Sequence, residues 1–373
     1  MTMTVKPKSI IKYIGLCLCL STGVINAQIL QDTTSLNLVK KDIDYIYNLQ
    51  FNNAREVHSE ISRLYPEHPV GFLLDGMIKY WENYPMLSST PARDSFESDM
   101  NQSILLSEKN KNSANEAEYL LADLCARGLL LTFYSDNDLS REVIPLTTST
   151  YKYLRRSFDY ASNCSDLNYF TGVYNYYREA YPKAYPLYKP IALLFPGGNI
   201  KIGLKQLQTA AKNSVLLRAE SYFLLAYIYL NFENNYPEAI FYSKSLHDLY
   251  PDNVLYLALY IKTLLLIKQY DIAEKLIRAL QDEKGNGYFT AQINIFKGIL
   301  QEKRYLDNNL AREYYKKGIN GISNFGVYGN EYAAYAYYGL SRISKANGEK
   351  HSGKIYRKKA MELADFKKIN FDK

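Results

Sequence analysis

The sequence contains few of the residues on which enzyme active sites and metal sites depend. Its 373 residues include four histidines, four cysteines and one tryptophan. No two histidines stand four residues apart, and the chain has no HExxH, GxSxG, Walker or dinucleotide-binding sequence. The sequence therefore predicts no catalytic residue, no metal site and no cofactor, and it argues against an enzyme.

Long apolar runs are also scarce. Near the start, lysines at positions 6, 8 and 12 accompany a short apolar segment, and small residues lead to Ala27. This order is typical of a secretory signal peptide, so we expect residues 1–27 to be removed after Ala27. No later stretch reaches about 18 apolar residues without a charge. We expect the mature chain, residues 28–373, to lack a transmembrane segment and to be exported to the periplasm or the cell exterior.

No linker divides residues 28–373 into domains. Glycines and prolines are few, and no stretch alternates apolar and polar residues as a half-buried strand does. The exception is the stretch 181–199, which holds four prolines and a Gly-Gly pair. We expect an irregular loop there with at most one turn of helix. The remainder predicts a single all-α domain.

The stretch 221–280 contains an internal repeat. Two strings, Tyr236-Pro-Glu-Ala239 and Tyr270-Asp-Ile-Ala273, stand 34 residues apart, and each opens an apolar stretch of helical period. A period near 34 is typical of stacked helix pairs. We therefore predict a solenoid of about seven or eight antiparallel helix pairs, with Ala239 and Ala273 at helix–helix contacts.

The residues of this repeat resemble the tetratricopeptide repeat. The first helix carries Leu225, Ala226 and Tyr229 on one face, the second carries Ala239, and Pro251 ends the unit. The resemblance implies a superhelix of helix pairs. Residues 186–280 are also similar to a eukaryotic tetratricopeptide family that includes an inclusion-body clearance protein, and this similarity implies the fold only.

In tetratricopeptide arrays the first helix of each pair lines the concave surface. Carried onto this chain, the resemblance implies groove residues in three successive first helices, namely Phe223, Tyr227 and Leu230, then Ala258, Lys262 and Leu265, then Ile299, Glu302 and Lys303. A mixed apolar and charged strip suits an extended or helical peptide anchored by one or two apolar side chains. The alternative is that another part of the same chain, for instance its C-terminal helix, fills the groove.

Tyrosine is unusually frequent, with 37 residues. Many fall at core positions, but six gather between positions 174 and 188, beside the irregular loop. Exposed tyrosines can contact protein or sugar. A carbohydrate or small ligand could bind at a patch of Tyr174, Tyr177, Tyr181 and Tyr185. The other interpretation is a tyrosine-rich core between repeats with some rings half exposed.

Cys125 and Cys164 are the cysteines outside the predicted signal peptide. In an oxidising compartment they could form a disulfide, which would stabilise the chain by roughly 4 kcal/mol through loop closure. However, Cys125 stands among leucines in a predicted helix, where a free thiol behaves as a small apolar side chain. Both alternatives stay open.

The formal net charge is +7, and many of the basic residues follow position 340. This basic stretch either binds an acidic surface or forms the solvated outer face of a terminal repeat. We expect no nucleic-acid binding, because no recognised motif for it is present. The predicted function is an exported scaffold that binds a protein or peptide, and the alternative is a carbohydrate- or small-ligand-binding protein.

Overall fold

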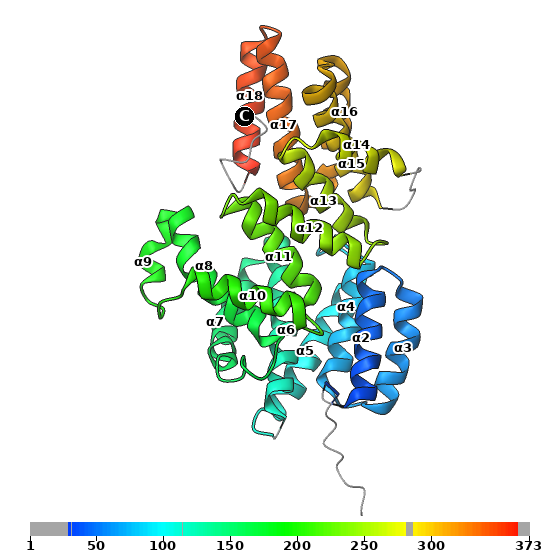
Figure 1. Cartoon of the computed structure of the whole chain (residues 1–373), viewed down its shortest axis with the longest axis vertical. Coiled ribbons are helices and arrows are strands. Elements are labelled where there is room, and N and C mark those ends of the chain that lie inside the picture. The colour runs from blue at the N-terminus through cyan, green and yellow to red at the C-terminus, as the bar shows by residue number, and fades with distance from the viewer. Residues whose placement is uncertain (1–28, 31, 114, 281–285, 365–373) are drawn as a thin grey trace, which may run out of the picture.

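The computed structural model describes residues 29–30, 32–113, 115–280 and 286–364. Within these ranges every regular element is a helix and no strand occurs, so the predicted all-α class is confirmed (Figure 1). The predicted signal peptide, residues 1–27, lies outside the described residues.

Consecutive helices pack against one another in pairs along the described chain. The pairs are α2 (Thr33–Tyr47) with α3 (Phe51–Leu64), α4 (Pro69–Glu82) with α5 (Arg93–Lys109), α6 (Glu116–Asp136) with α7 (Ser140–Ser157), α8 (Leu167–Ala184) with α10 (Ile200–Asn213), α11 (Arg218–Asn231) with α12 (Tyr236–Leu249), α13 (Val254–Leu266) with α14 (Tyr270–Ala279), α15 (Gly287–Leu300) with α16 (Asn308–Ile322), and α17 (Asn330–Ala346) with α18 (Lys350–Leu363). A π-helical turn, η2 (Gln301–Tyr305), follows α15, and η3 (Ser323–Gly329) joins α16 to α17. This order confirms the predicted solenoid of helix pairs.

The two strings of the repeat both open helices. α12 begins at Tyr236, where the Asn235 side chain accepts a hydrogen bond from the backbone of the first turn, and α14 begins at Tyr270. Ala239 and Ala273 have no exposed surface. Their lack of a long side chain lets each second helix approach its neighbours closely, as predicted.

The solenoid curves enough for distant segments to meet. The Asn253 side chain donates a hydrogen bond to the backbone oxygen of Tyr47 at 2.8 Å. Further along the chain, the Tyr328 hydroxyl donates to the backbone oxygen of Met86 at 3.2 Å. The first pair therefore contacts the start of α13, and the connection after α4 contacts η3. These contacts close the inner side of the superhelix at two places.

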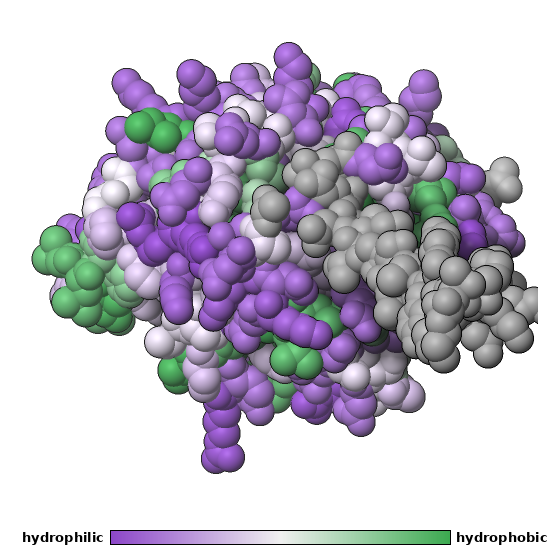
Figure 2. Space-filling model, turned by 90° about the horizontal axis from the view of Figure 1, so that it is seen from below, coloured by the Kyte–Doolittle hydropathy of each residue, from purple (hydrophilic) through white to green (hydrophobic). Residues whose placement is uncertain are grey.

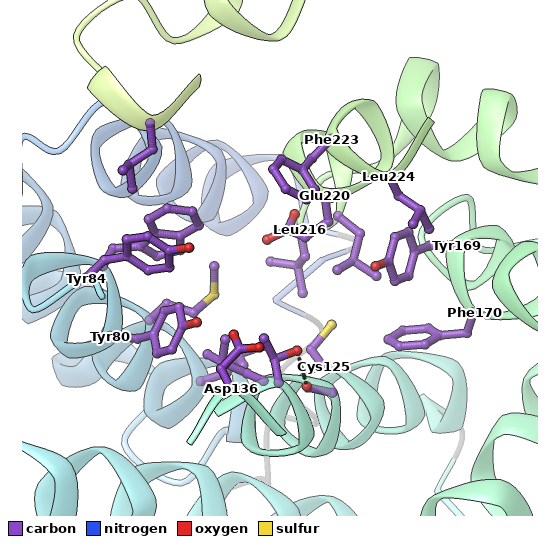
Figure 3. A pocket seen from close by; sticks show the side chains of 18 of the residues that line it. Tyr80, Tyr84, Cys125, Asp136, Tyr169, Phe170, Leu216, Glu220, Phe223 and Leu224 are labelled. Atoms are coloured by element: carbon purple, nitrogen blue, oxygen red, sulfur yellow. Dashed lines mark hydrogen bonds between the residues drawn. The ribbon is translucent and has the colours of Figure 1, made fainter. Parts of the chain in front are cut away.

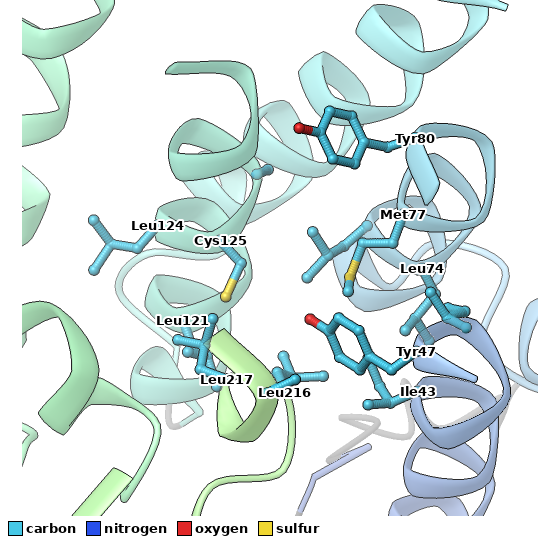
Figure 4. Close-up of a cluster of buried hydrophobic side chains, with 14 of the residues drawn as sticks. Ile43, Tyr47, Leu74, Met77, Tyr80, Leu121, Leu124, Cys125, Leu216 and Leu217 are labelled. Atoms are coloured by element: carbon cyan, nitrogen blue, oxygen red, sulfur yellow. The ribbon is translucent and has the colours of Figure 1, made fainter. Parts of the chain in front are cut away.

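Buried apolar residues form two clusters that meet on α13. The N-terminal cluster runs from α2 to α13, and the C-terminal cluster runs from α13 to α17. Figure 4 shows part of the first, in which Tyr47, Met77 and Leu216 come together from three helix pairs. The core is thus continuous along the array, as expected for stacked pairs that each bury one face against the next.

The stretch 181–199 leaves the regular array. After α8 it forms the short helix η1 (Pro186–Tyr188) and the single turn α9 (Lys189–Ala192), which project from the side of the molecule (Figure 1). The predicted irregular loop 181–199 thus begins later than expected, because residues 181–184 still belong to α8. Among the described residues, no helix is both long and apolar enough to cross a membrane.

Candidate binding pocket on the inner face

A cavity of about 500 Å³ lies on the inner face of the N-terminal part of the solenoid (Figure 3). Its lining belongs to the first helices of five consecutive pairs, α4, α6, α8, α11 and α13, or to the residues beside them. No residue of a second helix lines it. This arrangement agrees with the expectation that first helices form the inner surface of the array.

Aromatic rings form the α4 and α13 walls of the cavity. Trp81 stacks on Tyr84 with ring centroids 5.4 Å apart, and Tyr256 meets Trp81 edge to face at 5.9 Å. Tyr80 extends the same wall toward α6, while Tyr169 faces it from α8. Because these rings support one another, the wall is rigid and mostly apolar, as small-molecule and side-chain pockets usually are.

Gly128 creates part of the open space. A methyl group placed at this glycine would meet one neighbour within 4 Å, a ring carbon of Phe170 at 3.9 Å. Every other common side chain would project from α6 into the cavity, which Gly128 lines together with Leu129 and Thr132. The cavity therefore depends on glycine at a position where a helix would otherwise favour alanine or leucine.

Glu220 places a carboxyl group in this apolar surrounding. The Tyr47 hydroxyl donates a hydrogen bond to its Oε1 atom, whereas Oε2 is buried and has no hydrogen-bond partner among the described residues. Burial raises the pKa of Glu220 to about 8. At neutral pH the carboxyl group is therefore largely protonated, and it can donate or accept one further hydrogen bond toward the cavity (Figure 3).

The start of α11 holds Glu220 in place. The buried carboxylate of Asp166 accepts hydrogen bonds from the backbone nitrogens of Val215, Leu216 and Leu217, at 2.9, 2.7 and 2.9 Å. These bonds fix the connection from α10 to α11, and Glu220 follows in the first turn of α11. A second carboxyl group, that of Asp136 at the end of α6, lines the cavity from the opposite wall.

Cys125 also lines the cavity, and it is buried with a free thiol. Burial raises the pKa of Cys125 well above its ordinary value, so the thiol stays protonated and is a poor nucleophile. Cys164 is likewise a free thiol, and burial raises its pKa to about 11. Among the described residues, no group of three or more His, Cys, Asp and Glu side chains could hold a metal ion.

The predicted groove residues divide into two sets. Phe223 is 46% exposed and lines the cavity, and Tyr227, one turn further on, is half-buried beside Phe232. The others of α11 to η2 are mostly buried inside the chain's own packing, namely Leu230, Ala258, Lys262, Leu265, Ile299 and Glu302. Lys303 is half-buried beside Glu302. The predicted residues of α13 and α15 are therefore buried and line no open groove in the described structure.

Neighbouring first helices close the predicted groove. α13 packs on α15, and α15 packs on α17, so most of the predicted groove residues on α13 and α15 are buried. Lys262 instead forms an ion pair with Glu331 of α17 at 3.0 Å. Glu302 binds Arg342 of α17 at 2.6 Å. Another part of the same chain thus fills this groove, although it is α17 rather than the C-terminal helix α18.

The predicted tyrosine patch is not assembled as one surface. The Tyr174 hydroxyl donates to the backbone oxygen of Pro196 at 2.7 Å, and Tyr177 packs edge to face on Phe232. Tyr181 and Tyr185 pack on each other, with ring centroids 4.7 Å apart. The rings therefore serve local packing in the middle and at the C-terminal end of α8, and the described cavity includes none of them.

Sequence reasoning missed most of the cavity. Only Phe223 was predicted among its lining residues, because the walls come from segments between positions 73 and 256 that the superhelix brings together. No protein-family model matches the chain, and no curated protein is significantly similar to it. The tetratricopeptide likeness thus remains a resemblance of pattern within a helical-repeat fold.

Proposed function

We propose that this protein is a non-enzymatic scaffold that binds a peptide segment of another protein on its inner face. The observation that carries the proposal is the cavity of about 500 Å³ formed by five first helices, with Phe223 exposed at its edge. Cavities of this size and apolar character commonly receive a bulky side chain or a small ligand. The tetratricopeptide-like pattern supports a peptide partner.

The residues that line the cavity suggest which kind of peptide side chain it binds. Aromatic and aliphatic walls favour a large apolar side chain. Glu220 leaves its Oε2 atom without a hydrogen-bond partner, and Asp136 faces it from α6. A hydrogen-bond donor near the end of the inserted group, such as a hydroxyl, an amide or an amine, would meet these oxygens. Cys125 keeps its proton, which favours binding over covalent chemistry.

A peptide library displayed on phage and selected against the purified chain tests the proposal. We expect the selected peptides to share a bulky apolar residue with a donor at or beside it. The decisive variant is Gly128→Leu, which adds a bulky side chain to the part of α6 that lines the cavity, where a Cβ atom would meet only a ring carbon of Phe170 at 3.9 Å. The expected result is at least tenfold weaker binding of a selected peptide, measured by fluorescence polarisation.

Gly128→Ala is the matched control. It makes the same gain in helix propensity but adds a single methyl group, so binding should stay within a factor of about three of the unchanged chain. Equal binding by Gly128→Leu and the unchanged chain would contradict the proposed site. A library that yields no peptide, while small apolar molecules raise the melting temperature, would contradict a peptide partner.

We also propose that the chain acts outside the cytoplasm. This rests on the order of lysines, apolar residues and Ala27 in residues 1–27. N-terminal sequencing of the protein purified from its native cells should begin at Gln28. Recovery of the uncleaved chain from the cytoplasm would contradict export and would leave the pocket proposal unaffected.

A further inference from the structure

The segment that projects beyond α8 exposes an unusual amount of apolar surface. Leu187 is 85% exposed, and Leu193 and Leu194 are each 80% exposed. Ile191 is also exposed on the same short stretch. We name residues 181–195 the apolar tip. Figure 1 shows the tip standing away from the helix pairs, and Figure 2 shows hydrophobic residues gathered at that edge.

Hydrogen bonds from α8 hold the tip in its exposed position. The Arg178 side chain donates hydrogen bonds to the backbone oxygen of Phe195, the nearer at 3.1 Å. The Glu179 carboxylate accepts the backbone N–H of Gly198 at 3.1 Å. The C-terminal end of the tip is therefore fastened to α8, and its N-terminal end is the last turn of that helix, so the leucines are held outward in a defined loop. Exposed apolar patches lower the solubility of a protein and commonly mark a surface that binds a protein or a membrane.

The stretch of chain from Ala180 to Ala219, which contains the tip, carries charge of one sign. From Ala180 to Ala219 the chain contains no aspartate or glutamate, while it contains five lysines and one arginine. Lys183 and Lys189 lie in the tip itself, and both are exposed. Lys201, Lys205 and Lys212 are exposed on the adjacent helix α10. Such a collar is complementary to a negatively charged surface.

We propose that the apolar tip inserts into the interface of a membrane that contains anionic lipids. The leucines and Ile191 would enter the boundary between headgroups and acyl chains, and the lysines would contact lipid phosphates. Tyr181 and Tyr188, whose rings pack together with centroids 5.1 Å apart, stand behind them. Tyrosine favours this depth because its ring is apolar and its hydroxyl is polar.

The shape of the tip favours a membrane over a protein partner. The tip is convex and projecting, and its most exposed side chains are aliphatic, whereas protein interfaces concentrate aromatic and arginine anchors in pockets. The site is also separate from the cavity, which lies on the inner face between first helices. The mature chain would thus be held at a membrane by the tip while its inner face receives a partner.

Flotation of the purified chain with lipid vesicles tests this inference. We expect the chain to float with vesicles of phosphatidylcholine and phosphatidylglycerol, and to bind vesicles of phosphatidylcholine alone about tenfold more weakly. The double substitution Leu193→Ser with Leu194→Ser should weaken binding to the anionic vesicles at least tenfold. Lys183→Gln with Lys189→Gln should weaken it about tenfold at low salt, and added salt should remove that difference.

Ile144→Ser is the control, because Ile144 is an apolar residue on α7, outside the tip, and is 68% exposed. This variant should bind like the unchanged chain, and so should Gly128→Leu, which alters only the cavity. Failure of the unchanged chain to float with anionic vesicles would overturn the proposal. So would undiminished binding by the leucine variant, or a concentration-dependent dimer, seen by light scattering, that this variant abolishes in the absence of lipid.

Discussion

The N-terminal and C-terminal parts of the solenoid use the same helix pairs but treat the inner face differently. From α4 to α13, the first helices surround a cavity of about 500 Å³. From α13 to α17, they pack on one another directly. The difference lies in which side chains face the glycines of the first helices. Pairing of helices builds the array, whereas individual side chains decide whether its inner face stays open.

Tyr315 closes the C-terminal part. Its ring comes from the second helix α16 and is fully buried between Gly298 of α15 and Gly339 of α17. A methyl group at Gly298 would lie 2.7 Å from the ring, so each glycine is needed for the ring to fit. The hydroxyl group donates to Glu302 at 2.6 Å, which in turn binds Arg342. In α6, a methyl group at Gly128 would meet the Phe170 ring only at 3.9 Å, an ordinary van der Waals contact.

Truncation of Tyr315 should have the largest effect. Tyr315→Ala removes a buried ring and the donor to Glu302, and we expect the free energy of unfolding to fall by about 3–5 kcal/mol. Tyr169→Ala, which truncates a half-buried tyrosine at the cavity wall, should cost about 1–2 kcal/mol. Urea unfolding followed by circular dichroism measures both. Equal losses would show that the two parts are packed alike.

The two parts of the solenoid should also differ in how pH affects their stability, because each buries a glutamate in a different surrounding. Glu302 faces the Arg342 cation, whereas Glu220 has only the Tyr47 hydroxyl. Burial raises the pKa of Glu220 from 4.5 to about 8, so the folded state holds a proton that the unfolded chain releases above pH 4.5. The contribution of Glu220 to the free energy of unfolding is therefore largest below this pH and declines as the pH rises toward 8, by about 4–5 kcal/mol.

Glu220→Gln isolates this contribution, because other buried acids titrate in both proteins. The difference in unfolding free energy between the variant and the unchanged chain should grow in favour of the variant from pH 5 to pH 8. A difference that stays constant over this range would show that Glu220 is already ionised, and that the cavity is more polar than its walls suggest.

Substitution of the small residue in a second helix should cost less. Ala239 has no exposed surface, and Ala239→Leu should lower the free energy of unfolding by about 1–3 kcal/mol because the added carbons displace neighbours. Ala273→Leu should cost less than Ala239→Leu, since the short α14 buries only Ala273 and Ile277 and can shift outward. Thermal melting compares the two. An unchanged melting temperature for Ala239→Leu would contradict the packing of α12.

Sequence reasoning predicted the parts of the fold that depend on local pattern. The 34-residue period placed the starts of α12 and α14, whereas the expected loop 181–199 overlaps the last turn of α8, which includes Pro182. These features follow from helical periodicity and from residues that begin or end helices.

The candidate site could not be predicted in the same way. Leu216, Tyr80 and Cys125 come together only because the array curves, and curvature is the sum of small rotations between pairs. The same curvature buries Lys262 and Leu265, which an open superhelix would expose. The position of a residue within the repeat therefore does not by itself show whether its side chain is exposed, because neighbouring first helices can pack together and bury it.

A pair of glycine substitutions tests the contrast most directly. Gly128→Ala adds a methyl group where its one neighbour is 3.9 Å away, while Gly339→Ala drives a methyl group into the Tyr315 ring. Both substitutions favour the helix by about 1 kcal/mol. Urea unfolding should therefore show Gly128→Ala to be about 0.5–1 kcal/mol more stable than the unchanged chain and Gly339→Ala about 1–3 kcal/mol less stable. Shifts of the same sign would contradict an open N-terminal cavity beside a closed C-terminal core.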